Sequence, residues 1–182
     1  MKHLTVKEKE ATVFEKMKSD FHYKNVMAAP RLQKIVINVG TGTMIKKDKN
    51  KNDTIGARLA KITGQEPSKR GAKKSIASFK VRQGDPIGVM VTLRGKRMYA
   101  FLEKLINVAL PRTKDFRGIQ RSVVDNIGNL TIGIKEHTIF PETADEDIKD
   151  VFGMSITVVS SAKTKKEGTA FFELLGIPFK KE

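Results

Sequence analysis

The spacing of apolar residues predicts two amphipathic helices in the first two thirds of the chain. Apolar residues recur at helical spacing over 4–21 and, most clearly, over 96–109. Thr5 is the expected N-cap of the first helix, because Glu8 follows three positions later as a capping box requires. Pro111 is expected to end the second helix. Each helix therefore has one face that must pack on other elements.

Strands are predicted where β-branched residues form short runs or alternate with polar residues. The run RLQKIVINVG at 31–40 reads as a strand that ends at Gly40. In the segment 85–95, every second residue is apolar, so one face of that strand is expected to be buried. LTIGI at 130–134 and SITVV at 155–159 predict two further strands.

Two more helices complete the pattern. One carries Ile55, Leu59 and Ile62, with Asp53 as its expected cap and Gly64 as its end. The other is TAFFELL, near the end of the chain. Helices and strands do not alternate strictly, which favours an α+β fold with helices packed on one face of a mainly antiparallel sheet. A length of 182 residues fits one domain, 1–182, with the N-terminal helix 4–21 and a projecting basic loop at 70–84.

Charge then changes the picture. The chain has 35 Lys and Arg against 20 Asp and Glu, a net charge of +15 with a pI near 10.0. Such an excess attracts polyanions. The charge is uneven, because 67–97 holds nine basic residues and one acid, whereas 136–150 holds six acids and one lysine. Two kinds of partner are therefore expected, although the acidic segment is equally explained as a solvated face that only aids solubility.

Several kinds of chemistry find no support. The absence of cysteine excludes disulfides, thiolate metal sites and cysteine nucleophiles. No apolar stretch is long enough to span a membrane, and the N-terminus lacks the apolar core of a signal peptide. We expect a cytoplasmic protein without membrane, metal or cofactor. The three histidines lie far apart, and His137 is expected to be an ordinary exposed histidine.

Two alternative functions remain open at this point. KIVINVGTGTM resembles the start of a dinucleotide-binding turn, but Ile45 stands where the third glycine belongs. A small phosphate-handling enzyme would use this turn and the neighbouring lysines. A general DNA-compacting protein would also explain the net charge, and it would bind random duplex DNA as well as RNA.

The most basic stretch, SKRGAKKSIASFKVRQGDPIG at 68–88, favours RNA. Its positive charges alternate with small residues, which allow a backbone to approach phosphate closely. Phe79, expected to be exposed, is suited to stacking on a base or sugar. The alternative is a solvated loop without a partner. Because the whole chain is strongly basic, nucleic-acid binding is the better interpretation.

Three long blocks resemble the fifth large-subunit ribosomal protein family in its bacterial form: PRLQKIVINVG at 30–40, KKSIASFKVRQGDPIGVMVTLRG at 73–95 and LPRTKDFRG at 110–118. The resemblance extends to the closing LLGIPF. It implies a non-enzymatic α+β protein of the large ribosomal subunit. Its implied partners are 5S rRNA in the central protuberance, large-subunit rRNA, other central-protuberance proteins, the P-site tRNA and a basic protein of the small-subunit head.

This resemblance and the residue chemistry together predict three surfaces. The expected rRNA-binding residues, on and beside the polar face of the sheet, are Arg31, Asn38, Gln65, Thr92, Arg94, Lys96 and Arg97. The expected tRNA-contacting residues, in the basic loop, are Arg70, Lys73, Lys74, Ser75, Ser78, Phe79, Lys80 and Arg82. The expected inter-subunit contacts are Arg112, Asp115, Arg117, Glu142, Asp145 and Asp147.

Overall fold

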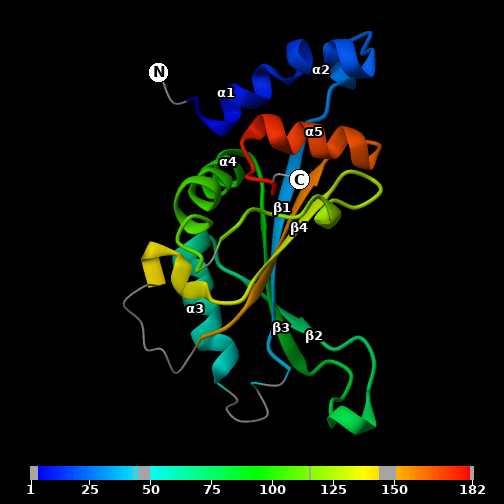
Figure 1. Cartoon of the computed structure of the whole chain (residues 1–182). Helices are drawn as coiled ribbons and strands as arrows, with labels where there is room; N and C mark the ends of the chain where they lie inside the picture. The colour runs from blue at the N-terminus through cyan, green and yellow to red at the C-terminus, as the bar shows by residue number, and fades with distance from the viewer. Residues whose placement is uncertain (1–3, 43, 45–49, 115, 144–150, 181–182) are drawn as a thin grey trace. The chain divides into compact units, whose positions relative to one another are not determined.

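The computed structural model describes residues 4–42, 44, 50–114, 116–143 and 151–180 (Figure 1). Five strands form a mainly antiparallel sheet in the order β2-β3-β1-β5-β4, which confirms the predicted α+β class. The strands are β1 (Leu32–Gly40), β2 (Ser68–Gly71), β3 (Pro86–Leu93), β4 (Leu130–Ile134) and β5 (Met154–Ser160). The α-helices are α1 (Val6–Ala11), α2 (Val13–Phe21), α3 (Lys51–Thr63), α4 (Gly95–Lys104) and α5 (Lys165–Leu175).

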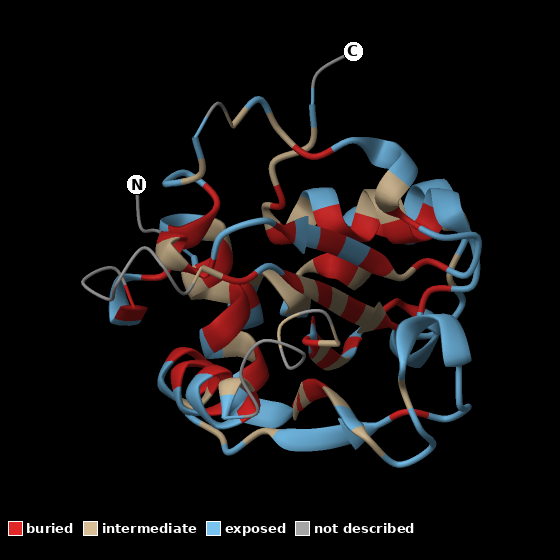
Figure 2. Ribbon diagram, turned by 90° about the horizontal axis from the view of Figure 1, so that it is seen from below, coloured by how far each residue is buried: buried red, intermediate tan, exposed pale blue. Residues whose placement is uncertain are grey.

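The chain divides into two compact units by its internal contacts. Unit 1 comprises residues 1–35, 94–132 and 157–182, and unit 2 comprises residues 36–93 and 133–156. Along the longer strands buried and more exposed residues alternate, as the banding in Figure 2 shows. One face of the sheet is therefore part of the core, and the other remains open.

In unit 2, β2 and β3 form an antiparallel hairpin and α3 packs on β3. Val89, Val91 and Leu93 of β3 are buried, as their alternation predicted. The end of α3 at Gly64 is also confirmed, because Gly64 is in the left-handed region at φ 67° and its N–H donates to the Ala60 carbonyl. The start differs, since the N-cap is Asn50 and the predicted cap Asp53 lies in the first turn.

The turn that follows β1 is held by hydrogen bonds to α3 and β3. The Thr41 N–H donates to the Ile87 carbonyl (2.9 Å), and the Thr41 hydroxyl bonds the Asn52 Oδ1 (2.6 Å). The Asn52 amide in turn donates to the Pro86 carbonyl (2.8 Å). Thr41 is fully buried. The GTG sequence is thus explained by packing between β1, α3 and β3, and its central amide is not available to cradle a phosphate.

The N-terminal segment of unit 1 forms two helices where its periodicity predicted one. The capping box is present, because the Thr5 hydroxyl accepts from the Glu8 N–H and the Glu8 carboxylate accepts from the Thr5 N–H. The break lies at Thr12, whose hydroxyl donates to the Lys9 carbonyl (2.8 Å). A β-branched residue that bonds the preceding turn in this way competes with helix continuation.

The two remaining helices of unit 1 follow the prediction with changes at their ends. The helix predicted over 96–109 begins as α4 and continues as a π-helical turn, Leu105–Ala109, in which the Leu110 N–H donates to the Leu105 carbonyl. Helix α5 begins four residues before TAFFELL, because the Thr164 hydroxyl accepts from the Glu167 N–H and caps it.

Both tyrosines of the chain donate to glutamates that also accept a backbone N–H. In unit 1, the Tyr99 hydroxyl bonds Glu10, whose other oxygen accepts from the Leu32 N–H (2.6 Å). The Tyr23 hydroxyl bonds Glu167 (2.5 Å), which also accepts from the Lys163 N–H (2.8 Å). These bonds tie α1 to α4 and the segment after α2 to α5.

The tyrosines should therefore titrate late. Burial, and then the hydrogen bond to Glu10, raise the pKa of Tyr99 to about 12. Burial, and then the hydrogen bond to Glu167, raise the pKa of Tyr23. Because the native values exceed the unfolded value of about 10, this contribution to stability is complete below pH 10 and is lost as the pH rises through the native pKa. At pH 10, tyrosinate absorbance should be absent from the folded protein and should reach about half of its maximum in protein unfolded by urea. Tyr99→Phe leaves Tyr23 alone to report, and a native titration near pH 10 would contradict the bonding.

Candidate nucleic-acid interface

The open face of the sheet in unit 2 presents short polar side chains. Asn38 is exposed on β1, between two buried neighbours, and Thr92 is half-buried on β3, also between buried neighbours. Because β1 and β3 are adjacent strands and both residues point away from the core, they lie on one face. This is the face on which sequence alternation predicted them.

Gln65 is brought to the same place by the end of α3. It directly follows the left-handed Gly64, and its side-chain amide donates to the Thr92 carbonyl (3.2 Å). Thr63 fixes the adjoining backbone, since its hydroxyl lies 3.1 Å from the Gln65 carbonyl oxygen. The structure thus joins Gln65 and Thr92, two predicted rRNA-binding residues that are far apart in sequence.

Three further predicted residues surround the start of α4 in unit 1. Arg94 is the N-cap in an extended conformation without a side-chain cap bond, and Lys96 and Arg97 follow in the first turn; all three are exposed. The first turn holds no acidic residue. Cations at the positive end of a helix dipole are unfavourable for the helix alone and favourable once an anion binds there. Arg31, also exposed in unit 1, lies just before β1.

The basic loop is the end of the β2–β3 hairpin and is held by its own backbone. Ala72 forms two backbone hydrogen bonds across the hairpin: its N–H donates to the Asp85 carbonyl, and its carbonyl accepts from the Gly84 N–H. Ile76 and Val81 form an isolated antiparallel bridge further out. The two bracketing glycines are needed, because a Cβ on Gly71 would lie 3.0 Å from the Gly84 oxygen and Gly84 has φ 90°.

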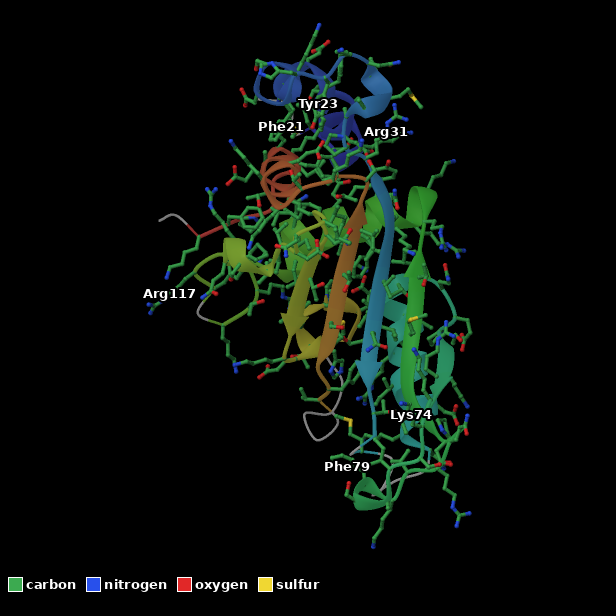
Figure 3. The ribbon with its side chains drawn as sticks, turned by 90° about the vertical axis from the view of Figure 1, so that its right-hand side faces the viewer. Phe21, Tyr23, Arg31, Lys74, Phe79 and Arg117 are labelled. Carbon is green, nitrogen blue, oxygen red and sulfur yellow. The ribbon has the colours of Figure 1, made fainter. Side chains whose placement is uncertain are left out.

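The side chains of this hairpin end are exposed. Phe79 is 60% exposed, which confirms that prediction, and it belongs to a short helical turn that ends at Lys80 in the left-handed region. Figure 3 shows Lys74 and Phe79 at the hairpin end. The one acid, Asp85, bonds the Arg82 N–H (2.7 Å) through its carboxylate. The remaining predicted tRNA-contacting residues are exposed as well: Arg70, Lys73, Ser75, Ser78, Lys80 and Arg82.

The predicted inter-subunit residues are only partly described. Arg112 and Arg117 are exposed in unit 1, and Glu142 is exposed in unit 2. The segment just after Arg117 is fixed to the C-terminal segment, because Ile119 donates to the Pro178 carbonyl and accepts from the Lys180 N–H. Asp115, Asp145 and Asp147 lie outside the described residues. The inter-subunit surface therefore stays a prediction.

Comparisons with known proteins identify the family. Residues 25–82 match the family model described as ribosomal protein L5, and residues 86–179 match the model of the same ribosomal family's C-terminus. This chain belongs to the ribosomal protein L5 family. It is 50% identical to the large ribosomal subunit protein uL5 of Pelobacter propionicus over 92% of this chain and 93% of the relative. It is 49% identical to uL5 of Mycoplasma mycoides over 98% of both chains, and 45% identical to uL5 of Synechocystis over 94% of both.

In this L5 family member, sequence reasoning missed a polar pair on the open face in unit 1. The hydroxyls of Thr131 on β4 and Thr157 on β5 lie 3.1 Å apart across the two strands. Both alternate with buried residues, in LTIGI and SITVV. That alternation was the signal available in the sequence, and it was used only to predict the strands.

His137 is where the structure contradicts the prediction, because this residue is fully buried in unit 2 rather than exposed. Its ring stacks on Phe152 (centroids 4.1 Å apart, 9° between planes), and its Nδ1 accepts from the Phe152 N–H. Glu136 and the surrounding charges gave His137 a polar setting in sequence, although the ring packs in the core.

Across the described residues, no cluster of three or more His, Asp or Glu side chains is arranged to bind a metal. Within the same ranges, no helix has the length and apolar character needed to cross a membrane.

Proposed function

We propose that this chain binds 5S rRNA on the open face of its sheet and helps attach that RNA to the central protuberance. As a member of the L5 family it is a structural constituent of the large ribosomal subunit, in the cytoplasmic ribosome, and not an enzyme. The observation that carries the proposal is the group formed in unit 2 by Asn38, Thr92 and Gln65.

The chemistry of that group suits an RNA helix. The minor groove of A-form RNA is wide and shallow and displays 2′-hydroxyls, so short amide and hydroxyl side chains on the open face of a sheet can reach it. Gln65 is held in place by its bond to the Thr92 carbonyl, which reduces the entropy lost on binding. Arg94, Lys96 and Arg97 follow β3 directly in the chain and would supply phosphate contacts, which position the RNA without reading its sequence.

Binding to 5S rRNA should depend steeply on salt. Each neutralised phosphate releases counterions, so replacing Arg94, Lys96 and Arg97 by alanine should lower the slope of log K against log salt by about two to three. Asn38→Ala should weaken binding and leave the slope unchanged, since it removes no charge. Filter binding over a salt series measures both quantities. Replacing Lys16, Lys18 and Lys24, three exposed lysines of the N-terminal segment, is the matched control for lost charge.

The same assay separates the alternatives. Salt-insensitive binding would contradict an RNA interface made by these residues. Equal affinity for 5S rRNA and for random duplex DNA would favour a general DNA-compacting protein. An unchanged slope in the triple variant, with the control also unchanged, would place the phosphate contacts elsewhere on the chain.

The hairpin end between β2 and β3 is proposed to contact the P-site tRNA. Four of its basic side chains, Lys73, Lys74, Lys80 and Arg82, are exposed on a backbone that internal hydrogen bonds already order. Phe79 offers an exposed ring for stacking on a base or ribose. An ordered, positively charged tip binds RNA with less loss of conformational entropy than a mobile loop would.

We propose that the acidic segment 136–150, or alternatively the loop LPRTKDFRG at 110–118, faces a basic protein of the small-subunit head. Neutralising Glu142, Asp145 and Asp147 together should loosen subunit association at low magnesium and leave 5S rRNA binding intact. Exposed charge contacts are individually weak, about 0–1 kcal/mol each, and are screened by salt. Sedimentation of ribosomes over a magnesium series measures the effect. Unchanged association would mean that the segment is only a solvated acidic face.

A further inference from the structure

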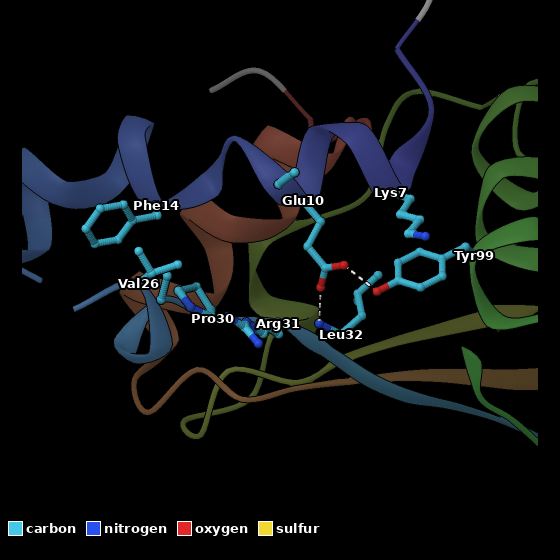
Figure 4. A pocket seen from close by; sticks show the side chains of 10 residues that line it. Lys7, Glu10, Phe14, Val26, Pro30, Arg31, Leu32 and Tyr99 are labelled. Carbon is cyan, nitrogen blue, oxygen red and sulfur yellow. Dashed lines mark hydrogen bonds between the residues drawn. The ribbon is translucent and has the colours of Figure 1, made fainter. Parts of the chain in front are cut away.

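A groove in unit 1 lies outside the interfaces proposed above, although Arg31, one of its lining residues, is also a predicted rRNA-binding residue. It has a volume of about 310 Å³ and lies among α1, α2, the segment before β1, and α4. Figure 4 shows Phe14, Val26 and Pro30 at one end, Lys7 and Tyr99 at the other, and Glu10 and Arg31 between them. The groove is therefore apolar at one end and polar at the other.

The one acid in the groove is already satisfied. Glu10 accepts the Leu32 N–H through one oxygen and the Tyr99 hydroxyl through the other. The two cations that line the groove, Lys7 and Arg31, are both exposed, so the lining carries two positive charges against one negative charge. An occupant of this groove is expected to bring an acidic group to its polar end.

The apolar end continues onto exposed apolar side chains. Val26 is 51% exposed and Met27 is 71% exposed, in a short helical turn capped by Asn25. The Arg31 guanidinium lies 3.3 Å from the Met27 sulfur, which holds the two side chains side by side. Methionine, arginine and aromatic residues are the types enriched at the centres of protein–protein interfaces.

We propose that this groove binds a segment of another protein, one that places an aliphatic or aromatic side chain next to an aspartate or glutamate. The apolar side chain lies against Phe14, Val26 and Pro30, and the carboxylate meets Lys7 at the polar end. The alternative occupant is RNA. Two exposed aliphatic side chains and a carboxylate make this groove less suited to a phosphate backbone than the start of α4, where three cations surround an uncapped helix end.

The test places a photoreactive p-benzoylphenylalanine at Val26 in a chain assembled into large ribosomal subunits. The same residue at Met27 serves as a second probe, since Met27 is the more exposed of the two. Irradiated subunits are digested, and the crosslinked species are identified by mass spectrometry. We expect a crosslink to a polypeptide segment that has Asp or Glu within two residues of its crosslinked apolar side chain.

Charge variants then test the polar end of the groove. Lys7→Glu should lower the crosslink yield severalfold, and Lys16→Glu, which makes the same change of net charge on an exposed lysine outside the groove, should not. Lys7 is used because Arg31 is also a candidate for rRNA contact. A crosslink to rRNA, a crosslink to a segment without acidic residues, no crosslink from either probe, or equal losses with the two charge variants would each overturn the proposal.

Discussion

Replacing Lys73, Lys74, Lys80 and Arg82 together by alanine is expected to speed the loss of tRNA from the P site by about tenfold to a hundredfold and to leave 5S rRNA binding unchanged. Loss of several phosphate contacts lowers affinity through counterion release, by amounts of this order near physiological salt. The difference in tRNA affinity between the variant and the unaltered chain should be largest at low to moderate salt. The rate at which tRNA leaves the variant should also depend less on salt.

The hairpin architecture is the reason to expect such a separation. The four side chains are exposed, whereas the bonds that shape the tip join backbone groups to one another or to the side chains of Asp85 and Ser75. Alanine removes none of these bonds, so the tip keeps its conformation. Incorporation into the large subunit should therefore remain close to that of the unaltered chain.

A companion substitution, Phe79→Ala, separates stacking from charge. If the ring stacks on the tRNA, its removal should cost about 1–3 kcal/mol of tRNA binding. Since Phe79 is 60% exposed, the melting temperature should hardly change. Dissociation of labelled tRNA from reconstituted ribosomes measures both variants. The control for four lost charges is a variant with alanine at Lys16, Lys18, Lys24 and Lys163. If the loop variant failed to bind 5S rRNA, the loop would contact that RNA, and its assignment to tRNA would be wrong.

Gly168→Ala is expected to destabilise the protein by about 3 kcal/mol, although alanine is the better helix former by about 1 kcal/mol. Gly168 lies in the first turn of α5, and a Cβ there would come within 2.6 Å of the Gly128 Cα and 2.9 Å of the Gly128 oxygen. These are backbone atoms, which cannot rotate away.

The backbone at Gly128 is also fixed and cannot move away from a Cβ at position 168. Its φ is 81°, its carbonyl accepts from the Ser160 hydroxyl (2.7 Å), and a Cβ on it would lie 2.6 Å from the Ala162 Cβ. Urea unfolding measures the loss of stability. Gly133→Ala is the matched control, because it has no atom within 4 Å of its Cβ position and no positive φ. A Gly168→Ala variant as stable as this control would show that α5 can shift away from the 125–129 turn.

Strands β3, β4 and β5 were predicted within a residue or two, because each buries one face and alternates in sequence. Strand β1 was predicted equally well from its run of apolar, β-branched residues. Strand β2 was missed for the complementary reason. All four of its residues are exposed, so SKRG has no alternation, and it is a strand only because it pairs with β3. The break at Thr12 and the π turn after α4 were missed because the helical spacing of apolar residues continues through both.

In the candidate RNA site, too, some features were predictable from local sequence and others were not. Alternation was sufficient to place Asn38 and Thr92 on the open face of the sheet. The bond from Gln65 to the Thr92 carbonyl depends on how α3 returns toward β3, a long-range arrangement that no local pattern encodes. The opposite error occurred at His137, where flanking charge suggested exposure and the ring is packed on Phe152.

The position of β2 at the edge of the sheet has a consequence for the protein before it meets RNA. An edge strand offers unpaired backbone groups to other chains, and proteins commonly prevent such pairing with short length, charge and bulges. Strand β2 has all three, with four residues, the cations Lys69 and Arg70, and an irregularity in register between Arg70 and Gly71. The charge that would attract RNA therefore also opposes aggregation of newly made chains, and that protection weakens as salt screens it.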